Sequence, residues 1–222
     1  MDKSHIRYSF EKQLKDLEQE LLSMGGTVEE MLSKAIRALV ERDTALADEA
    51  IAMDDIADEY NLNIETHCLR LLALQQPMAR DLRTIAAAMK IITDIERMGD
   101  YTVDIAKTAK ILAENPPYKP LIDIPKMAEI VQRMLREVLE AFVSRDLELV
   151  EKMIRDDDEV DHFAHYLHEQ IADAIQEKPS ITRQALRLLL ITRYLERIAD
   201  HITNVGERVY YMETGELKEL HQ

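Results

Sequence analysis

The sequence predicts an all-α protein in which six long antiparallel helices form two similar three-helix bundles. The first reason is composition: the 222 residues include only 5 Gly and 6 Pro and are rich in Leu, Ala, Glu, Arg and Met, which favour helices. The second is an internal repeat, because residues 94–100 (DIERMGD) recur as residues 194–200 (YLERIAD). Short connections between long helices force neighbours to pack antiparallel.

In the first half of the chain, helices are expected at residues 10–41, 44–74 and 78–112. Apolar residues recur at helical spacing through the first of them, with Gly25-Gly26 as a soft point. Asp43 can cap the second helix, since its side-chain oxygen can accept an unpaired backbone N–H. Pro77 ends the second helix, because proline disfavours an α conformation in the residue before it and suits the first turn of the next helix.

Residues 115–120 (NPPYKP) form the strongest break in the chain. We therefore expect one repeat at residues 1–115 and another at residues 116–222. In the second repeat, helices are expected at residues 127–144, 147–176 and 180–212. Arg145-Asp146 repeats Arg42-Asp43, and Ser180 is the expected N-cap of the last helix.

The acidic residues of the repeated motif lie within the apolar stripes of their predicted helices. At about 100° of rotation per residue, Leu82 and Met89 fall within about 40° of Asp100. Leu62 and Leu69 likewise fall within about 40° of Asp58 around the axis of its helix. Antiparallel packing brings the acids of neighbouring helices to one level of the bundle. The candidate metal ligands are Asp54, Asp58, Glu96, Asp100 and Asp104 in the first repeat, and Asp157, Asp161, Glu196, Asp200 and Asn204 in the second.

Burying an ionised carboxylate costs several kcal/mol unless it is paired, protonated or bound to metal. Three outcomes are therefore open: pairing with arginine, for instance Arg193 with Glu196; a raised pKa; or a bound cation. A cluster of carboxylates suits Mg²⁺, Mn²⁺ or Ca²⁺, and also Fe. In the second repeat His165 and His168 project onto the acidic arc, which would favour Fe or Zn, although a polar role for each histidine is at least as plausible.

Charge and motif content exclude several classes of function. A formal net charge of −15 argues against direct nucleic-acid binding, which needs a basic surface. Phosphate-binding loops, nucleophile elbows, zinc-protease motifs and paired cysteines are absent, and only Glu159-x-x-His162 matches the di-iron pattern of ferritin-like bundles. Neither a secretory signal nor an apolar run of about 18 residues is present. We expect a soluble cytoplasmic protein that meets membranes only through partners, and Cys68 is expected to be an inert core thiol.

The duplicated Glu-Arg-x-x-Asp at Glu96–Asp100 and Glu196–Asp200 resembles the paired E(D)xxxD signature of the PhoU family. The segments 75–83 (QQPMARDLR), 24–26 (MGG) and 211–216 (YMETGE) resemble the same family, so the resemblance covers nearly the whole chain. One departure is Ala199, where the family commonly has Gly.

The resemblance implies two similar three-helix bundles, usually in a homodimer, and metal ions or clusters at Glu96, Asp100, Glu196 and Asp200. It also implies a non-enzymatic cytoplasmic regulator that restrains the phosphate ABC transporter and helps to hold the phosphate-responsive two-component system off. The implied partners are the transporter's ATPase subunit and the sensor histidine kinase. Two alternatives remain: a carboxylate-rich, metal-dependent hydrolase such as a phosphatase, and a helical interaction module whose acids only bias solubility and partner choice.

Overall fold

The computed structural model describes residues 3–75, 77–117 and 123–220, and in these ranges the chain is helical with no strand. The elements are α1 (Lys3–Glu41), α2 (Thr44–Ala52), α3 (Asp54–Gln75), α4 (Arg80–Ala113), α5 (Asp123–Ser144), α6 (Leu147–Glu177), the 3-10 turn η1 (Pro179–Ile181) and α7 (Thr182–Thr214). The predicted all-α fold class is confirmed. Gln76 and residues 118–120 of the expected breaks lie outside the described residues.

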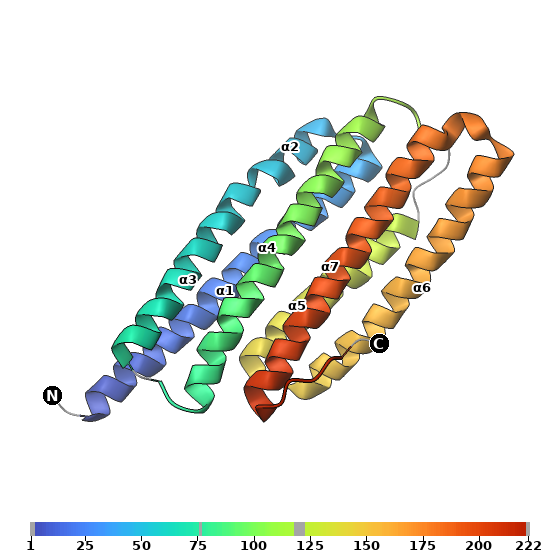
Figure 1. The fold of residues 1–222 in the computed structure, drawn as a ribbon. Coiled ribbons are helices and arrows are strands. Elements are labelled where there is room, and N and C mark those ends of the chain that lie inside the picture. Colours follow the sequence, from blue (N-terminus) through green and yellow to red (C-terminus); the bar gives the residue numbers. More distant parts are fainter. Residues whose placement is uncertain (1–2, 76, 118–122, 221–222) are drawn as a thin grey trace.

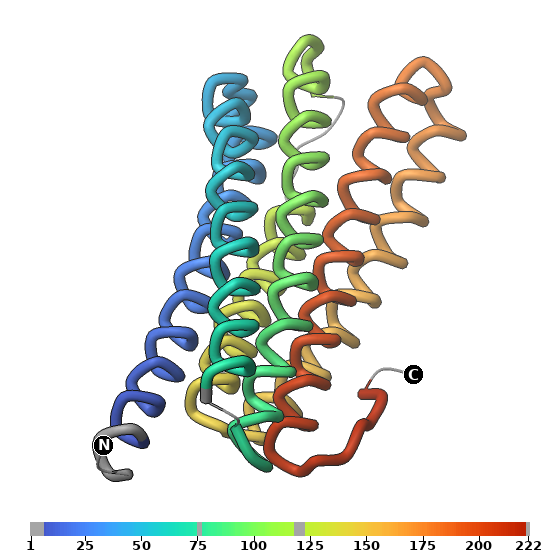
Figure 2. The backbone as a smooth tube through the Cα atoms, turned by 60° about the vertical axis from the view of Figure 1, so that its left-hand side comes forward, coloured from blue at the N-terminus to red at the C-terminus, as the bar shows by residue number. Residues whose placement is uncertain are grey.

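The helices form two layers. Helices α3, α4, α7 and α6 lie side by side in one layer, with α4 and α7 at its centre, and α1 and α5 lie behind them (Figure 1). We call the outer surface of the four-helix layer the front face. Helices α4 and α7 run antiparallel beside each other over most of their length (Figure 2). This pairing, together with that of α1 and α5, joins the two bundles into one body.

A continuous apolar core runs through both bundles, as the helical spacing of apolar residues predicts. Its largest fully buried side chains include Phe142 and Leu17. Helices α1 and α5 are in close contact at Gly25, where an added Cβ would overlap Leu139 Cδ1. Gly25 is therefore a packing residue. Gly26, by contrast, faces open space.

The turn after α1 is repeated after α5. Arg42 and Arg145 both adopt the left-handed conformation, with φ of 59° and 65°. The aspartate that follows each arginine caps the next helix, because Asp43 accepts the N–H groups of Ala45 and Leu46, and Asp146 accepts that of Glu148. The cap predicted at Asp43 is confirmed, and the repeat extends to backbone geometry.

Several boundaries differ from the sequence prediction, among them the start of α1, which lies at Lys3 and not at residue 10. The helix expected at residues 44–74 is divided at Met53, after which Asp54 and Asp55 occupy the first turn of α3, where the helix dipole favours negative charge. Ser180 is not the N-cap of α7, because it lies in η1 and the cap position is Ile181, without a side-chain cap. Helix α5 begins at Asp123, since Pro125 is compatible with a first helical turn.

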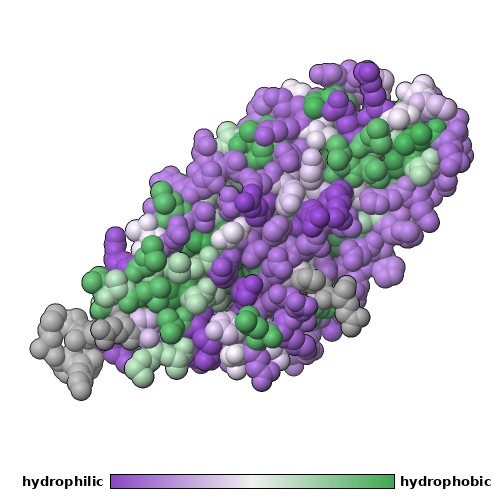
Figure 3. Space-filling model, in the orientation of Figure 1, coloured by the Kyte–Doolittle hydropathy of each residue, from purple (hydrophilic) through white to green (hydrophobic). Residues whose placement is uncertain are grey.

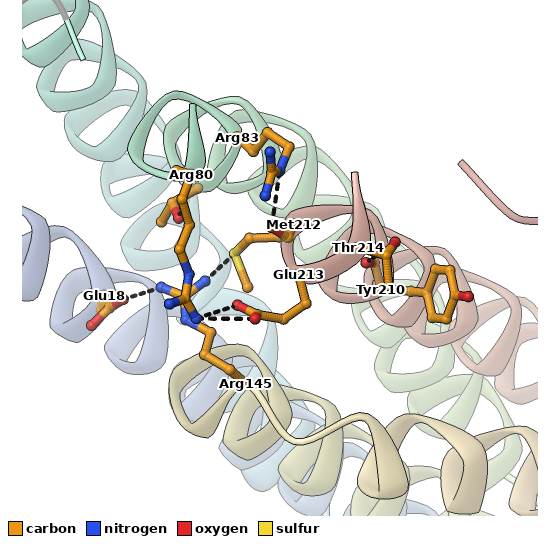
Figure 4. Close-up of polar contacts among 9 residues, drawn as sticks. Glu18, Arg80, Arg83, Arg145, Tyr210, Met212, Glu213 and Thr214 are labelled. Atoms are coloured by element: carbon orange, nitrogen blue, oxygen red, sulfur yellow. Dashed lines mark hydrogen bonds and ion pairs between the residues drawn. The ribbon is translucent and has the colours of Figure 1, made fainter. Parts of the chain in front are cut away.

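A polar cluster ties the start of α4 to the end of α7 and to the α5–α6 turn (Figure 4). Arg80 donates to the carboxylate of Glu213 at 2.7 Å, and Arg83 donates to the carbonyl of Met212 at 3.1 Å. Arg145 pairs with Glu18 of α1 at 2.5 Å. These contacts cross from one bundle to the other. No helix in the described ranges combines the length and apolar character needed to cross a membrane.

Candidate functional site

The first acidic group is built on α3 and α4, which pack as neighbours. Asp54 and Asp58 stand one turn apart on α3, and Glu96 and Asp100 stand one turn apart on α4. A Cβ added to Gly99 would lie 3.4 Å from Asp54 Oδ1, so the Asp54 carboxylate reaches the backbone of α4. The structure thus brings these four acids to one level of the bundle.

The carboxylates of the first group repel one another. Partial burial raises the pKa of Asp54, and the charges of Asp58 and Asp100 raise it further. Partial burial also raises the pKa of Glu96; Arg97 opposes this rise, and Asp100 and Asp58 add to it. The group therefore carries negative charge that its surroundings compensate only in part.

The second acidic group repeats the first on α6 and α7. Partial burial raises the pKa of Asp161, and the charges of Glu196 and Asp200 raise it further. Asp157, one turn before Asp161 on α6, is half-buried. Opposing acids on neighbouring helices are therefore present in both bundles, at corresponding positions of the repeat.

Arginines of the repeated motif neutralise part of this charge. Arg97 Nη1 lies 2.9 Å from Asp100 Oδ2, and Arg197 makes the same contact with Asp200 at 3.4 Å. Glu196 pairs with Arg193 at 2.8 Å. Both pairing with arginine and raised pKa values, which the sequence left open beside a bound cation, therefore occur in this structure.

The acidic stripes face outward more than the sequence predicts. Asp58 and Asp161 are exposed, and Leu62 and Leu69, expected in the apolar core stripe of α3, are 64% and 53% exposed. Helix α3 lies at the edge of the front layer. The side of α3 that carries Ala57 and Ile64 is buried against α1 and α4, and the side that carries Asp58 is exposed to solvent. We call the two acidic groups together the acidic belt, which consists of Asp54, Asp58, Glu96, Asp100, Asp157, Asp161, Glu196 and Asp200.

The acidic belt has donors suited to a cation, but its side chains are not gathered around one point. Among the residues the structure describes, no three or more His, Cys, Asp or Glu side chains lie close enough to hold a metal ion. Its oxygen-only carboxylates and their mutual repulsion fit a hard cation in chemistry and charge. Binding would require some carboxylates to change rotamer.

Asp104 and Asn204 lie apart from the two acidic groups, at the contact between α4 and α7. Asn204 donates to Asp94 Oδ1 at 3.2 Å, and the charge of Asp104 contributes to the raised pKa of Tyr194 after burial of that ring. His165 lies 3.5 Å from Glu169 on its own helix, and the buried Nε2 of His168 has no hydrogen-bond partner among the residues that the structure describes.

The α4–α7 contact contains polar residues that the sequence analysis did not single out. His201 Nδ1 lies 2.9 Å from Asp94 Oδ1, and the rings of Tyr101 and Tyr194 stack with centroids 6.0 Å apart. The signal was present in the repeat, because positions 94 and 194, and 101 and 201, hold different residues. The two repeat-related contacts between the bundles therefore differ in chemistry: Asp94 and His201 form a polar contact, and Tyr101 and Tyr194 form an aromatic one.

Comparison with known proteins places these features in a family. The model of the PhoU domain matches the chain twice, at residues 21–109 and 124–209. The chain belongs to the PhoU family. Both copies of the Glu-Arg-x-x-Asp motif fall within the matched ranges, so the duplication seen in the sequence and in the helices is a duplication of the PhoU domain.

Curated PhoU relatives match nearly the full chain. A protein of Aquifex aeolicus described as a phosphate-specific transport system accessory protein PhoU homolog is 39% identical, over 93% of this chain and 93% of its own length. The homolog from Clostridium acetobutylicum, with the same description, is 37% identical over 96% of this chain and 98% of its own length.

Two solved PhoU structures share the fold. PhoU from Pseudomonas aeruginosa is 33% identical and superimposes with a TM-score of 0.89, covering 93% of this chain and 100% of that one. The phosphate transport system regulatory protein PhoU from Streptococcus pneumoniae is 34% identical and superimposes with a TM-score of 0.88, covering 94% of this chain and 99% of that one. Ala199 fits this fold, because a Cβ at the equivalent Gly99 would meet nothing closer than 3.4 Å.

Proposed function

We propose that this PhoU-family protein is a cytoplasmic, non-enzymatic regulator of phosphate uptake and of phosphate-starvation signalling. In this proposal it contacts the ATPase subunit of the phosphate ABC transporter and the phosphate-sensing histidine kinase, and it acts as a negative regulator of the phosphate regulon. The observation that supports the proposal most is the match, over nearly the whole chain, to relatives described as accessory proteins of the phosphate-specific transport system.

The regulatory proposal is tested by binding to the two partners. Purified protein is passed over the immobilised ATPase subunit and, separately, the cytoplasmic part of the kinase, with phosphate present and absent. We expect saturable binding to each partner that changes with phosphate. Absence of binding to both partners under both conditions would contradict the proposal. We further propose a homodimer, which sedimentation equilibrium would detect as twice the 25.7 kDa chain mass.

We also propose that the acidic belt binds a hard divalent cation or iron, with Fe, Zn, Mg and Mn as the candidates. Asp54, Asp58, Glu96 and Asp100 would hold it in the first bundle, and Asp157, Asp161, Glu196 and Asp200 in the second. A bound cation would supply the positive charge that these partly buried carboxylates lack. Asp104 and Asn204 remain candidate ligands at the edge of the belt.

Metal content measured by mass spectrometry tests this site. We expect the Glu96→Ala/Asp100→Ala protein to retain about half of the wild-type metal, because the second bundle keeps its own group. The Glu129→Ala/Glu140→Ala protein is the matched control, since both acids are exposed on α5 away from the belt. Equal metal in all three proteins would refute the assignment. Cation-dependent hydrolysis of a phosphate ester, lost in the Glu96→Ala/Asp100→Ala protein, would instead favour a phosphatase.

A further inference from the structure

Exposed apolar side chains gather at both ends of the front face, on either side of the acidic belt (Figure 3). The first patch consists of Leu69 and Leu82, which are 53% and 44% exposed, above the half-buried Leu72 and Met89. The second consists of Leu186 and Leu190, which are 49% and 48% exposed, above the half-buried Ile175 and Leu189. Soluble domains seldom leave such groups uncovered without a partner.

The two patches occupy corresponding places in the two repeats. Met89 and Leu189 hold equivalent positions on α4 and α7, and Leu72 and Ile175 hold equivalent positions on α3 and α6. Because α4 and α7 run antiparallel, the repeat places the patches at opposite ends of one face. Each patch thus lies across two neighbouring helices, an arrangement on which the apolar stripe of a third helix can pack.

Charge beside each patch restricts what can cover it. Helix α3 carries Asp58 and Glu65 on the turns before the first patch. Beside the second patch, residues 156–177 of α6 contain no Lys or Arg. The opposite side of each patch is basic, because Lys90 is exposed on α4 and Arg183 is exposed on α7. A covering helix therefore needs lysine or arginine along the edge that faces α3 or α6, and acidic residues along the edge that faces α4 or α7.

We propose that each patch binds one amphipathic helix of a protein partner, with the apolar stripe of that helix over the leucines and its Lys/Arg edge toward the acidic helix α3 or α6. Two patches on one face, related by the repeat, suit a partner that presents two such helices, and simultaneous binding would raise its affinity. The inference builds on the proposed function, in which the protein acts through partners, but it requires neither metal nor phosphate.

The experiment titrates the full-length protein into a fluorescent synthetic helical peptide that carries a leucine stripe, with lysines along one edge of the stripe and glutamates along the other. We expect two peptides bound per chain. The control peptide keeps every lysine and glutamate and replaces each leucine with serine, and we expect it to bind more than about tenfold more weakly because no apolar side chain is buried. Equal binding of both peptides would overturn the proposal, because the acidic belt alone would then attract them.

Variants of each patch locate the bound peptides. Leu69→Ser/Leu82→Ser and Leu186→Ser/Leu190→Ser should each reduce the stoichiometry from two to one. Leu217→Ser is the matched control, because Leu217 is exposed outside both patches and should leave two sites. These positions are on the surface, and unchanged melting curves would show that the variants fold. Unchanged stoichiometry in both patch variants would overturn the proposal.

The same variants and peptide also distinguish peptide binding at the patches from self-association of the chain and from the proposed role in phosphate regulation. If the patch variants convert a wild-type dimer to a monomer and the peptide does not bind, the occupant is a second copy and the proposal is wrong. Peptide binding with the expected stoichiometry would stand even if neither phosphate-system partner bound the protein. Failure of the proposed function and failure of this inference are therefore separate results.

Discussion

Asp94 on α4 and His201 on α7 meet across the centre of the molecule, with His201 Nδ1 2.9 Å from Asp94 Oδ1. Asn204 donates to the same carboxylate oxygen at 3.2 Å. The repeat-related contact, about two turns further along α4, is the stack of Tyr101 and Tyr194, and the ring of Tyr101 also lies 5.8 Å from that of His201. The junction between the bundles therefore combines hydrogen bonds to Asp94 with adjoining aromatic contacts.

We expect Asp94 and His201 to be energetically coupled. A double-mutant cycle of Asp94→Ala and His201→Ala, followed by urea unfolding, should give a coupling free energy of about 0.5–1.5 kcal/mol, typical of a half-buried hydrogen bond. His201→Ala with Tyr60→Ala, a half-buried ring on α3, serves as the uncoupled control. Additive effects of Asp94→Ala and His201→Ala would show that the contact contributes nothing to stability.

The two adjacent glycines of α1 should respond to alanine in opposite ways. Gly25→Ala should lower the free energy of unfolding by about 1–2 kcal/mol, because its Cβ overlaps Leu139 by more than the gain in helix propensity offsets. Gly26→Ala should raise it by about 0.5–1 kcal/mol, since no atom lies within 4 Å of the new Cβ. Chemical denaturation measures both, and stabilisation by Gly25→Ala would contradict the close packing.

Neutralising one acid in each group should stabilise the metal-free protein at neutral pH. The folded-state pKa values of Asp54 and Asp161 are raised, so the folded state binds more protons than the unfolded state just above pH 4, and stability falls as pH rises through that range. Asp54→Asn and Asp161→Asn should each raise Tm by about 1–3 °C at pH 7.

The same gain in Tm should disappear near pH 4, where the wild-type carboxyls take up protons. Asp173→Asn, at an exposed position of α6, is the control and should change Tm little at either pH. Calorimetry at several pH values in the presence of a chelator measures the difference. A gain that persists unchanged into acid would show that charge repulsion is not its cause.

Glycine substitutions at Arg42 and Arg145, the two left-handed turn positions, should distinguish the stability cost of backbone strain from the contribution of side-chain contacts. Replacing Arg42 or Arg145 with glycine relieves about 1 kcal/mol of strain at positive φ. Within the described part of the chain, the side chain of Arg42 donates an exposed hydrogen bond to the carbonyl of Ala113, so Arg42→Gly should be close to neutral. Arg145 loses Glu18, Met212 and the ring of Phe142, so Arg145→Gly should destabilise by about 1–2 kcal/mol in thermal unfolding. Equal effects would argue against the bridging role of Arg145.

The helical order of the chain was predictable because the signals that define it are local. Asp43 caps its helix through backbone groups only a few residues away, and Pro77 ends a helix through its own ring and its neighbour. The division at Met53 was not predictable in this way. The apolar period runs through Met53 without interruption, and only the aspartates that follow it mark a new first turn.

The acids of the belt were identifiable because the chain repeats them, but their surroundings were not. Rotation about a helix shows that Asp58 and Leu69 share a side, and it does not show whether that side faces the core. The structure exposes both, because α1 and α4 cover the other side of α3. Asn204 likewise shares an arc with Asp200 and yet donates to Asp94 across the α4–α7 contact.

By itself the sequence determined the all-helical fold, the cap at Asp43 and the duplication of the acidic motif, since helix formation and repetition depend on residues close together along the chain. Only the tertiary structure decided which side of each helix is covered and which residues of the two repeats meet. Burial and pairing depend on the helices packed alongside, and residues such as Asp94 and His201 lie more than a hundred positions apart in the chain.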